Sequence, residues 1–318
     1  MIDRYGREIT YLRISLTDLC NLRCVYCMPP EGVGKLQHRD ILSIEDVAEI
    51  AAAAVELGVK KIRLTGGEPL VRRGVVELVR MLKALPGLEE LAMTTNGILL
   101  PSLARTLKDA GLDRVNISLD TLDAEKYRML TRCGSLEQAL DGIRAAEQAG
   151  FFPIKLNAVL IGGVNDDEIP ALVALTRDRP LELRFIELMP IGDAFPFGPE
   201  AYLPAETVLE RVPELRPAES PRGSVARLYA LPGAAGRVGL IRPLSCSFCG
   251  ECNRLRLTAD GYLKPCLHSD REFSLKGLRG DALKEAILAA VNAKPEAHAA
   301  LSATERSDAG RNMNEIGG

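Results

Sequence analysis

Histidine and long apolar runs are scarce in this chain of 318 residues. Its only histidines are His38, His268 and His298, so thiolates must supply most of the ligands of any metal site. No stretch approaches the ~20 apolar residues that cross a bilayer, and no membrane partner is expected. The first residues also lack the apolar segment of an export signal, and we therefore expect a cytoplasmic protein.

An excess of positive charge is lacking as well. The net charge of −3, from 40 basic and 43 acidic residues, excludes a generally basic surface that coats nucleic acid. An anionic ligand would therefore have to be bound by a local cluster of Lys and Arg. The hydrophobic content of 47% is typical of a globular protein, and the length allows one large domain or two ordinary ones.

Short apolar runs alternate with amphipathic segments over the first 190 residues. The runs are rich in β-branched residues or leucine, as expected for strands buried on both faces. They predict strands over 11–16, 61–65, 90–94, 114–119, 154–160 and 182–188, and the segments between them predict helices over 44–57, 75–82, 101–111, 135–150 and 165–177. Six such units predict an α/β fold with a parallel sheet, two units short of a closed (β/α)₈ barrel.

The alternation stops near residue 190, where the chain becomes rich in proline and glycine. We therefore expect a partial, open (β/α)₆ barrel over residues 1–189 and an irregular region over 190–318. One helix is predicted in that region, over 280–293. The polar segment 302–318 has no periodicity, which predicts an unpacked tail.

The first group of cysteines is Cys20, Cys24 and Cys27, a C-x₃-C-x₂-C spacing just after the first predicted strand. Grouped cysteines in a chain without an export signal indicate a metal site. One interpretation is a zinc site of three Cys and one His, with His38 as the fourth ligand. The other is a [4Fe–4S] cluster, which normally takes four thiolates, so that three leave one iron open to a ligand.

The second group of cysteines is Cys249, Cys252 and Cys266. Cys246 extends this group and is a candidate fourth ligand. A structural zinc with four cysteines and an iron–sulfur cluster agree equally well with the spacing. Cys133 has no cysteine nearby in the sequence and is expected to be an ordinary buried thiol.

Polar residues stand at or near the carboxyl ends of the predicted strands, which form the ligand-binding face of a parallel barrel. They include the turn Thr65-Gly66-Gly67-Glu68, whose glycines allow close approach of a ligand. Further along the chain they are Thr94, Asn96, Ser118, Asp120, Lys155, Asn157, Arg184, Glu187 and Met189. Taken one at a time, most would be strand caps or core residues, but together they predict a shared cavity mouth.

Arg254 and Arg256 point to one face if they lie on a strand, beside the second cysteine group. Their planar guanidinium groups suit a phosphate-bearing ligand, although a solvated surface pair is the simpler alternative. Five other cations could join them at the barrel mouth: Arg13, Lys61, Arg63, Lys155 and Arg184. A polyanionic substrate would explain this local excess of positive charge.

The C-x₃-C-x₂-C spacing after the first strand resembles the signature of the radical S-adenosylmethionine (SAM) superfamily. Over the whole chain, the segments LRISLTDLCNLRCVYCMP, IRLTGGEPLVRR, MTTNG, VNISLDTLD, RFIELMPIG, CGECNRLRLTADGYLKPCL and the terminal IGG resemble the molybdenum cofactor biosynthesis protein A family. That family is the GTP 3′,8-cyclases, which are lyases. The resemblance implies a radical SAM barrel whose C-terminal region carries a second cluster.

The resemblance also implies the reaction and the roles of residues. SAM cleavage would yield a radical that abstracts the 3′ hydrogen of GTP, and C3′ would then join C8 to give 3′,8-cyclo-7,8-dihydro-GTP. The first cysteine group would hold the [4Fe–4S] cluster that binds SAM, and the second would hold a [4Fe–4S] cluster that binds guanine. SAM would contact Tyr26, Gly67, Glu68, Ser118 and Met189. GTP would contact Arg13, Lys61, Arg63, Thr94, Lys155, Arg184, Arg254 and Arg256, and Gly317 and Gly318 would act in catalysis with Arg13.

The implied partners are an external, flavodoxin-like one-electron reductant and a cyclic pyranopterin monophosphate synthase that takes the product onward. A homodimer is left open. Two alternatives remain at this point: a peptide-modifying radical SAM enzyme with an auxiliary cluster, and an electron carrier with two clusters. The carrier would need neither the Gly-Gly-Glu turn nor a barrel of this length.

Overall fold

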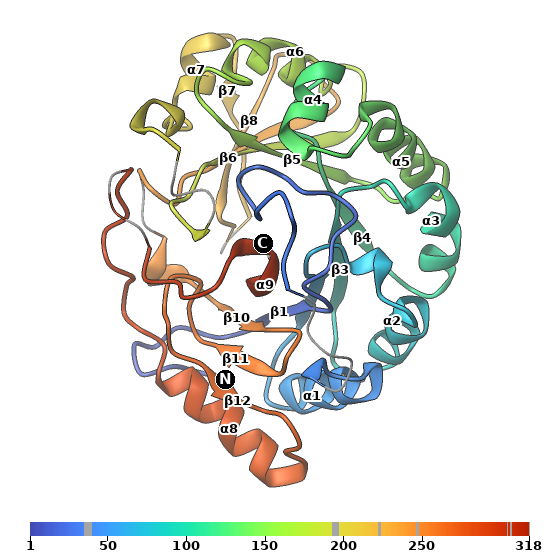
Figure 1. The fold of residues 1–318 in the computed structure, drawn as a ribbon, viewed down its shortest axis with the longest axis vertical. Helices are drawn as coiled ribbons and strands as arrows, with labels where there is room; N and C mark the ends of the chain where they lie inside the picture. Colours follow the sequence, from blue (N-terminus) through green and yellow to red (C-terminus); the bar gives the residue numbers. More distant parts are fainter. Residues whose placement is uncertain are drawn as a thin grey trace.

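The computed structural model describes residues 1–34, 40–192, 197–221, 224–245, 248–303, 305 and 307–317. The predictions that concern His38, Cys246 and Gly318 lie outside these residues. Within them, the strands form one sheet in the order β12-β11-β10-β1-β2-β3-β4-β5-β6-β9-β8-β7. The helices surround this curved sheet, and helix α9 (Met313–Ile316), near the end of the chain, lies inside it (Figure 1).

The first six strands are parallel neighbours, as predicted, and each pairs with the next along the chain. Their bounds are β1 Tyr11–Ser15, β2 Lys61–Thr65, β3 Glu90–Thr95, β4 Arg114–Ser118, β5 Ile154–Leu160 and β6 Leu181–Glu187. The helices between them are α1 Ile44–Glu56, α2 Val75–Lys83, α3 Leu100–Asp109, α4 Ala124–Thr131, α5 Leu136–Gln148 and α6 Ile169–Ala174. The partial, open barrel is therefore confirmed, with α4 as an additional helix.

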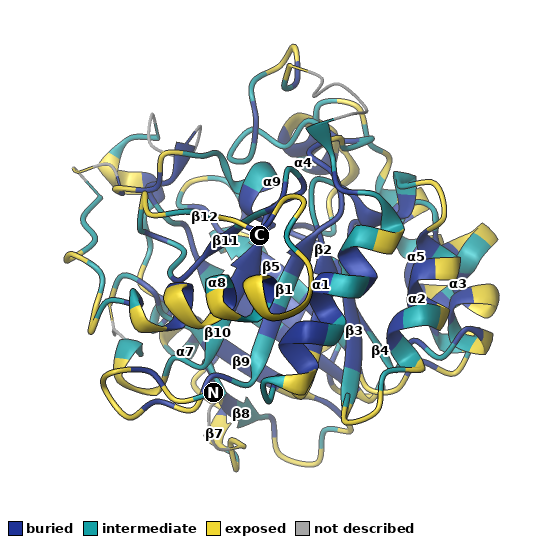
Figure 2. Cartoon of the chain, turned by 90° about the horizontal axis from the view of Figure 1, so that it is seen from below, coloured by how far each residue is buried: buried dark blue, intermediate teal, exposed yellow. Residues whose placement is uncertain are grey.

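Local signals explain why these helices begin where they do. Ser43 caps α1 through a capping box, since its hydroxyl accepts from the Asp46 amide at 3.0 Å and the Asp46 carboxylate accepts from the Ser43 amide at 3.2 Å. The unpredicted helix α4 is capped by Asp123, whose carboxylate accepts from two amides of the first turn. The helices expose their outer faces, while the strands beneath them are buried (Figure 2).

The C-terminal region is more regular than the sequence indicated. Its elements are α7 Thr207–Arg211, β7 Arg216–Pro217, β8 Ala226–Ala230, β9 Arg237–Ile241, β10 Arg254–Leu257, β11 Tyr262–Lys264, β12 Phe273–Ser274, α8 Gly280–Asn292 and α9 Met313–Ile316. β9 pairs in parallel with β6, and β10 pairs in parallel with β1, so this region extends the barrel sheet at both edges. The division into residues 1–189 and 190–318 stays a prediction.

The prediction of an unpacked tail is wrong for the described residues 307–317. Asn314 is 1% exposed and Ile316 is fully buried in a small apolar cluster with Ile191 and Ala309. Helix α9 is four residues long, too short to show a helical period in the sequence, and its burial depends on contacts with distant segments. Within the described residues, no helix has the length and apolar character needed to cross a membrane.

Candidate active site

A cavity with a volume of about 660 Å³ lies inside the curve of the sheet. Strands β1 to β6 and β10 contribute side chains to its wall, and the tail contributes Met313 and Asn314. All six cysteines predicted as ligands line it, namely Cys20, Cys24, Cys27, Cys249, Cys252 and Cys266. Both predicted cysteine sites therefore open into the same space.

The two cysteine sites lie toward opposite ends of the strands. The loop of Cys20 follows the carboxyl end of β1, whereas Cys252 precedes the amino end of β10. These strands are parallel, with Arg254 opposite Tyr11. A five-residue strand rises about 3.3 Å per residue, so the sites are separated by roughly 15 Å along the strand direction.

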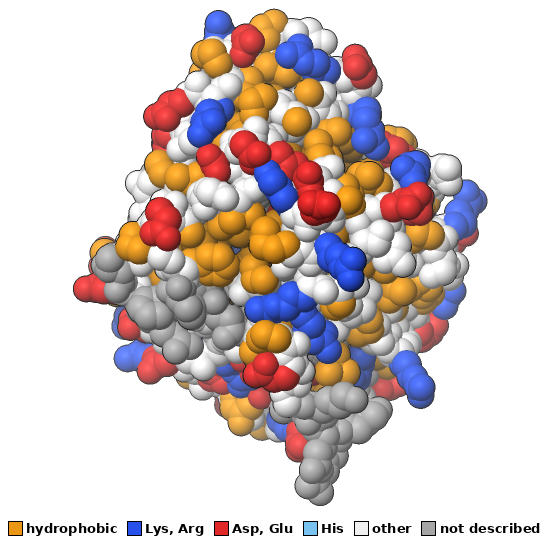
Figure 3. Space-filling model, turned by 45° about the horizontal axis from the view of Figure 1, so that its top comes forward, with side chains coloured by type: hydrophobic (Ala, Val, Ile, Leu, Met, Phe, Trp, Pro, Cys, Tyr) orange, Lys and Arg blue, Asp and Glu red, His pale blue; other side chains and the backbone are white. Residues whose placement is uncertain are grey.

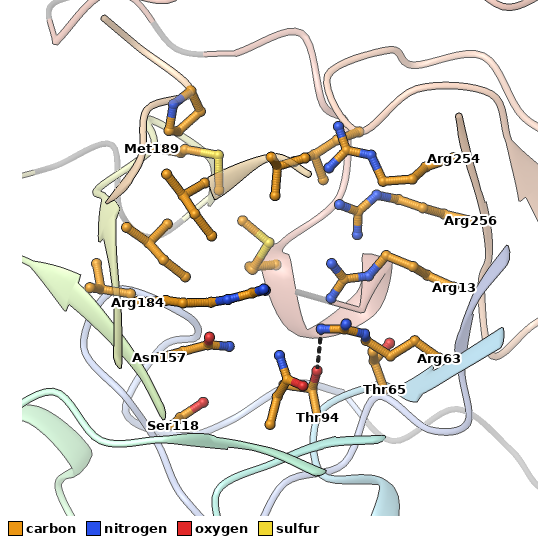
Figure 4. A pocket seen from close by; sticks show the side chains of 18 of the residues that line it. Arg13, Arg63, Thr65, Thr94, Ser118, Asn157, Arg184, Met189, Arg254 and Arg256 are labelled. Carbon is orange, nitrogen blue, oxygen red and sulfur yellow. Dashed lines mark hydrogen bonds between the residues drawn. The ribbon is translucent and has the colours of Figure 1, made fainter. Parts of the chain in front are cut away.

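Strand register gathers the predicted arginines into one group, which we call the arginine column: Arg13, Arg63, Arg254 and Arg256. Arg13 on β1 stands opposite Arg63 on β2 and opposite Arg256 on β10. Arg254 shares the face of Arg256 because side chains alternate along a strand. Figure 4 shows the four guanidinium groups, one above another, pointing into the cavity from the same wall.

The arginine column concentrates positive charge, with Arg63 and Arg256 buried and Arg13 and Arg254 half-buried. Burial, followed by the charge of Arg256, lowers the pKa of Arg13 well below its usual value. Burial, followed by the charge of Arg254, lowers the pKa of Arg256 to about 10. Arginine side chains stay protonated in proteins, so a bound anion would relieve the mutual repulsion of these guanidinium groups. On the outer face in Figure 3, by contrast, basic and acidic side chains are interspersed.

Other predicted cations of the cavity are matched by carboxylates. Lys61 lies 3.5 Å from Glu90. Lys155 and Arg184 share Glu182, with N–O distances of 2.8 and 2.5 Å. Burial, followed by the charge of Arg184, lowers the pKa of Lys155 to about 8 in spite of this carboxylate.

Three arginines of the column differ from these matched cations. Within the described residues, Arg63, Arg254 and Arg256 form no ion pair with a carboxylate. Arg63 instead donates to the Thr94 hydroxyl at 3.5 Å (Figure 4), and Arg254 lies over the ring of Phe248 at 4.9 Å. The surface-pair alternative is wrong for Arg254 and Arg256, because both line the cavity.

The first cysteine site is a loop held against the end of α4. Arg23 and Val25 donate backbone hydrogen bonds to Thr131 and Leu130 at 3.0 and 2.9 Å. Arg132 donates to the carbonyls of Arg23 and Met28, at 2.9 and 2.8 Å, and so joins both ends of the segment that contains Cys24 and Cys27.

Burial controls the thiols of this first site. It raises the pKa of Cys20 to about 11, although the Leu22 amide donates to the sulfur at 3.3 Å. Burial, followed by the proximity of Cys27, raises the pKa of Cys24 well above its usual value. A bound metal cluster would supply the positive charge that stabilises these thiolates.

The Gly-Gly-Glu turn packs directly against this cysteine loop. A Cβ at Gly67 would lie 2.3 Å from the Leu19 carbonyl, so only glycine lets the cysteine loop pack this closely. Glu68 does not line the cavity; its carboxylate accepts from Leu70, Thr95 and Asn96 at 3.0, 2.7 and 2.8 Å. Burial raises the pKa of Glu68 to about 7, and its predicted contact with SAM stays a prediction.

The other four residues predicted to contact SAM line the cavity: Tyr26, Gly67, Ser118 and Met189. The Tyr26 hydroxyl donates to Asp120 at 2.6 Å, and the Val159 amide donates to the same carboxylate at 2.9 Å. These bonds fix the aromatic ring beside Cys24 and Cys27.

The second cysteine site is surrounded by positive charge. Burial raises the pKa of Cys252, but the charges of Arg254 and Lys294 outweigh this and lower it to about 7. Lys294 is 2% exposed and donates to the carbonyls of Arg254 and Pro265 at 2.9 and 2.7 Å. Lys294 was not predicted, because no sequence pattern connects it with the cysteines.

A zinc ion and a [4Fe–4S] cluster require different spacings of their thiolate ligands. Four tetrahedral ligands at about 2.3 Å place zinc-bound sulfurs about 3.8 Å apart. In the described chain, no three Cys, His, Asp or Glu side chains are close enough to hold one metal ion. A [4Fe–4S] cluster binds each thiolate through a different iron and needs a wider spacing of the thiolates.

The tail reaches the arginine column. Arg256 donates to the Gly317 carbonyl at 2.7 Å. Gly317 has φ of 78°, and a Cβ there would lie 2.1 Å from the Thr65 hydroxyl, so the position requires glycine. The sequence prediction placed Gly317 at the active site, and the structure places it in contact with a residue of the cavity wall.

The prediction that Cys133 is an ordinary buried thiol is wrong. Cys133 is exposed and not buried, because it lies in the turn after α4.

Asn116 and Arg114 line the cavity but were not predicted as site residues. They alternate with the apolar Val115 and Ile117 on β4 and share the strand face of Ser118, so the period-two pattern was the signal that could have identified them.

Comparisons with known proteins agree with this geometry. A family model described as the radical SAM superfamily matches residues 14–176, and one described as Molybdenum Cofactor Synthesis C matches residues 181–300. Among solved structures, Streptococcus suis SuiB bound to S-adenosylmethionine has a TM-score of 0.59 at 14% identity, over 88% of this chain and 63% of that one. This likeness shows the fold alone.

Relatives with much higher identity extend over the whole chain. GTP 3′,8-cyclase of Alkaliphilus oremlandii is 50% identical over 100% of both chains. GTP 3′,8-cyclase of Peptoclostridium acidaminophilum is 53% identical over 100% of this chain and 98% of its own. The cysteine loops, the arginine column and the buried tail thus belong to a member of the GTP 3′,8-cyclase family within the radical SAM superfamily.

Proposed function

We propose that this chain is a GTP 3′,8-cyclase of molybdenum cofactor biosynthesis, which converts GTP to (8S)-3′,8-cyclo-7,8-dihydroguanosine 5′-triphosphate. The observation that carries the proposal is one cavity lined by two cysteine sites with an arginine column between them. A peptide substrate would leave the buried positive charge of this column unexplained. An electron carrier would need no such cavity.

Membership of the radical SAM superfamily implies a [4Fe–4S] cluster and SAM, and we assign the cluster to Cys20, Cys24 and Cys27. When bound, the reduced cluster and SAM supply a 5′-deoxyadenosyl radical. Tyr26, held by Asp120, would orient SAM beside this loop. Gly67, Ser118 and Met189 complete the proposed SAM surface.

We assign a second [4Fe–4S] cluster to Cys249, Cys252 and Cys266. The charges of Arg254 and Lys294 favour the thiolate of Cys252, which is the form that binds iron. With three thiolates, this cluster keeps one iron for the guanine base. Cys246 is proposed not to be required.

The arginine column is proposed to bind the triphosphate. A guanidinium group can donate two parallel hydrogen bonds to the oxygens of one phosphate. In the column, Arg63, Arg254 and Arg256 have no carboxylate partner among the described residues. Lys61, Lys155 and Arg184 contribute less because each already pairs with a carboxylate, Lys61 with Glu90 and the other two with Glu182. Thr94, which accepts a hydrogen bond from Arg63, would lie near the reacting sugar.

Binding both ligands in one enclosed space is the protein's main contribution to catalysis, because it fixes the distance between the reacting groups and excludes water. The SAM loop lies toward the carboxyl ends of the strands and the guanine site toward their amino ends, so the ribose would lie between them. Arg13 and Gly317 lie at this intermediate level and are proposed to act there. Gly318 would follow directly.

The proposal also includes an external, flavodoxin-like reductant and a cytoplasmic location. A cyclic pyranopterin monophosphate synthase would take up the product. The test is anaerobic turnover of reconstituted protein with dithionite, SAM and GTP deuterated at C3′. The expected result is the cyclised nucleotide together with 5′-deoxyadenosine that carries deuterium. Deuterium-free 5′-deoxyadenosine with no cyclised product would contradict the proposal.

A further inference from the structure

Helix α9 and Gly317 depend on tertiary contacts for their position in the cavity. A helix of four residues is not stable by itself, since even much longer isolated helices are marginal in water. Its end carries Gly317 to Arg256, and its Asn314 side chain donates to the Asp18 carbonyl at 3.2 Å, next to the SAM loop. A residue that fixes the start of α9 therefore also fixes the position of Gly317 at its end.

Arg311, directly before the α9 cap residue Asn312, is held by two carboxylates. Its guanidinium group lies 2.7 Å from both oxygens of Glu272, and 3.1 and 3.0 Å from the two oxygens of Asp260. It also lies over the ring of Tyr262, with its central carbon 5.4 Å from the ring centroid. All three partners belong to the β10–β12 ribbon and its turns, the ribbon that carries Arg254 and Arg256.

This arrangement differs from an ordinary surface ion pair. The Arg311 side chain is 20% exposed and its carboxylate partners are 18% and 19% exposed. Paired N–H···O bonds to each carboxylate define the orientation of the guanidinium group, which a single exposed ion pair does not. Arg311 does not line the cavity, whereas Met313 and Asn314, just after it, do.

We propose that Arg311 is a positioning residue that docks the tail on the β10–β12 ribbon and so holds Gly317 at the arginine column. This function in the reaction rests on the cyclase activity proposed above. Arg311 touches neither substrate nor cofactor; it acts through α9. Without it, the tail would leave the cavity for part of the time, and SAM cleavage would proceed without cyclisation of GTP.

The ribbon itself should survive the loss of Arg311. Glu272 also pairs with Lys264 at 3.1 Å, and Lys264 donates to the Ser269 carbonyl at 2.7 Å. Glu272 therefore retains a cation when Arg311 is replaced. Asp260 is partly exposed and can be hydrated. The variant Arg311→Gln is expected to keep both cysteine sites and its fold.

The chain offers a matched control in Arg279. This arginine also bridges two carboxylates, Asp46 and Glu49, at 2.5 and 2.7 Å, but it joins α8 to α1 on the outside of the barrel. Arg279→Gln removes a network of the same composition, although a more exposed one, without affecting the tail. Arg311→Lys tests geometry, because it keeps the charge but loses the paired bonds.

The experiment measures amide hydrogen exchange of the peptide covering 312–317 in reconstituted protein, together with cyclised product formed per SAM cleaved. In Arg311→Gln, the amides of this peptide should exchange at least about 10-fold faster than in the parent protein or in Arg279→Gln, because hydrogen bonds between charged groups are lost. The product per SAM cleaved by Arg311→Gln should fall by a similar factor, with GTP-free SAM cleavage unchanged and Arg311→Lys intermediate.

Unchanged exchange in Arg311→Gln would overturn the docking role, and faster exchange with unchanged product per SAM would overturn its consequence for the reaction. Failure of the cyclase proposal gives a different result: the parent protein itself would form no cyclised product. The exchange measurement would still decide the docking role in that case.

Discussion

The two cysteine sites have the same number of described cysteines but opposite electrostatic surroundings. At the first site, burial raises the pKa of Cys20 to about 11, and the nearby carboxylates of Glu68 and Asp120 add to the positive shifts of the thiols. At the second site, Arg254 and Lys294 outweigh burial and lower the pKa of Cys252 to about 7. Three cysteine thiols therefore lie in a different electrostatic field at each site.

This difference matches the proposed ligands. SAM carries a sulfonium and an ammonium group, which need no cationic partners and are favoured near carboxylates. GTP carries a polyanion, which needs the cations that surround the second site and the arginine column. The field around each cysteine site, and not the cysteine spacing alone, therefore supports the ligand proposed for it.

The largest expected effects come from removing one site at a time. Cys24→Ala should abolish SAM cleavage, because no other site is proposed to bind SAM. Cys252→Ala should retain SAM cleavage and lose cyclisation. Each variant should lose about four irons per chain, measured by iron analysis after anaerobic reconstitution. Loss of SAM cleavage in both variants would show that the sites do not work separately.

The arginine column supplies the next largest effect. Arg256→Ala should weaken GTP binding about 10- to 150-fold, because a hydrogen bond between charged groups contributes roughly 1.5–3 kcal/mol. Arg184→Ala should have a clearly smaller effect, since Glu182 already balances that charge. Equilibrium binding of GTP measures both, with SAM binding as the control. Equal effects of the two changes would contradict the division between matched and unmatched cations.

Lys155 gives a smaller, pH-dependent effect. Its pKa is about 8, so it is charged below this pH and neutral above it. A polyanion favours the charged form, and GTP affinity should therefore decrease as the pH rises from 7 to 9. In Lys155→Met this part of the decrease should disappear. Binding curves of the two proteins that stay parallel over this range would exclude a contribution of Lys155.

The smallest effect serves as a reference outside both sites. Ser43→Ala removes the capping box of α1, on the outside of the barrel, and should lower the free energy of unfolding by about 1 kcal/mol. Binding of SAM and GTP should not change. Denaturant unfolding measures the first and equilibrium binding the second. A change in either affinity would mean that the sites respond to general stability.

Much of the barrel could be predicted because its signals are local. Strands such as 61–65 and 154–160 carry aliphatic residues at every second position, and the Ser43 capping box defines a helix start within four residues. The cysteine sites were also local patterns. Short elements such as α9 lack a period, and their burial depends on contacts with Ile191 and Ala309 that the sequence does not reveal.

The charge balance of the cavity could not be predicted because it depends on register. Arg13 lies between Arg63 and Arg256 only through the pairing of β1 with β2 and β10. The same holds for Lys155, which stands opposite Glu182 across β5 and β6. Sequence analysis therefore identified the cations of the site without separating those that carboxylates already balance.

The most direct test of the two-site account is electron paramagnetic resonance of the reduced, reconstituted protein, titrated separately with SAM and with GTP. Two [4Fe–4S] signals are expected. SAM should alter only the signal that is missing in Cys24→Ala, and GTP should alter only the signal that is missing in Cys252→Ala. A single signal, a second site that holds zinc in fully active protein, or one signal that responds to both ligands would contradict the account.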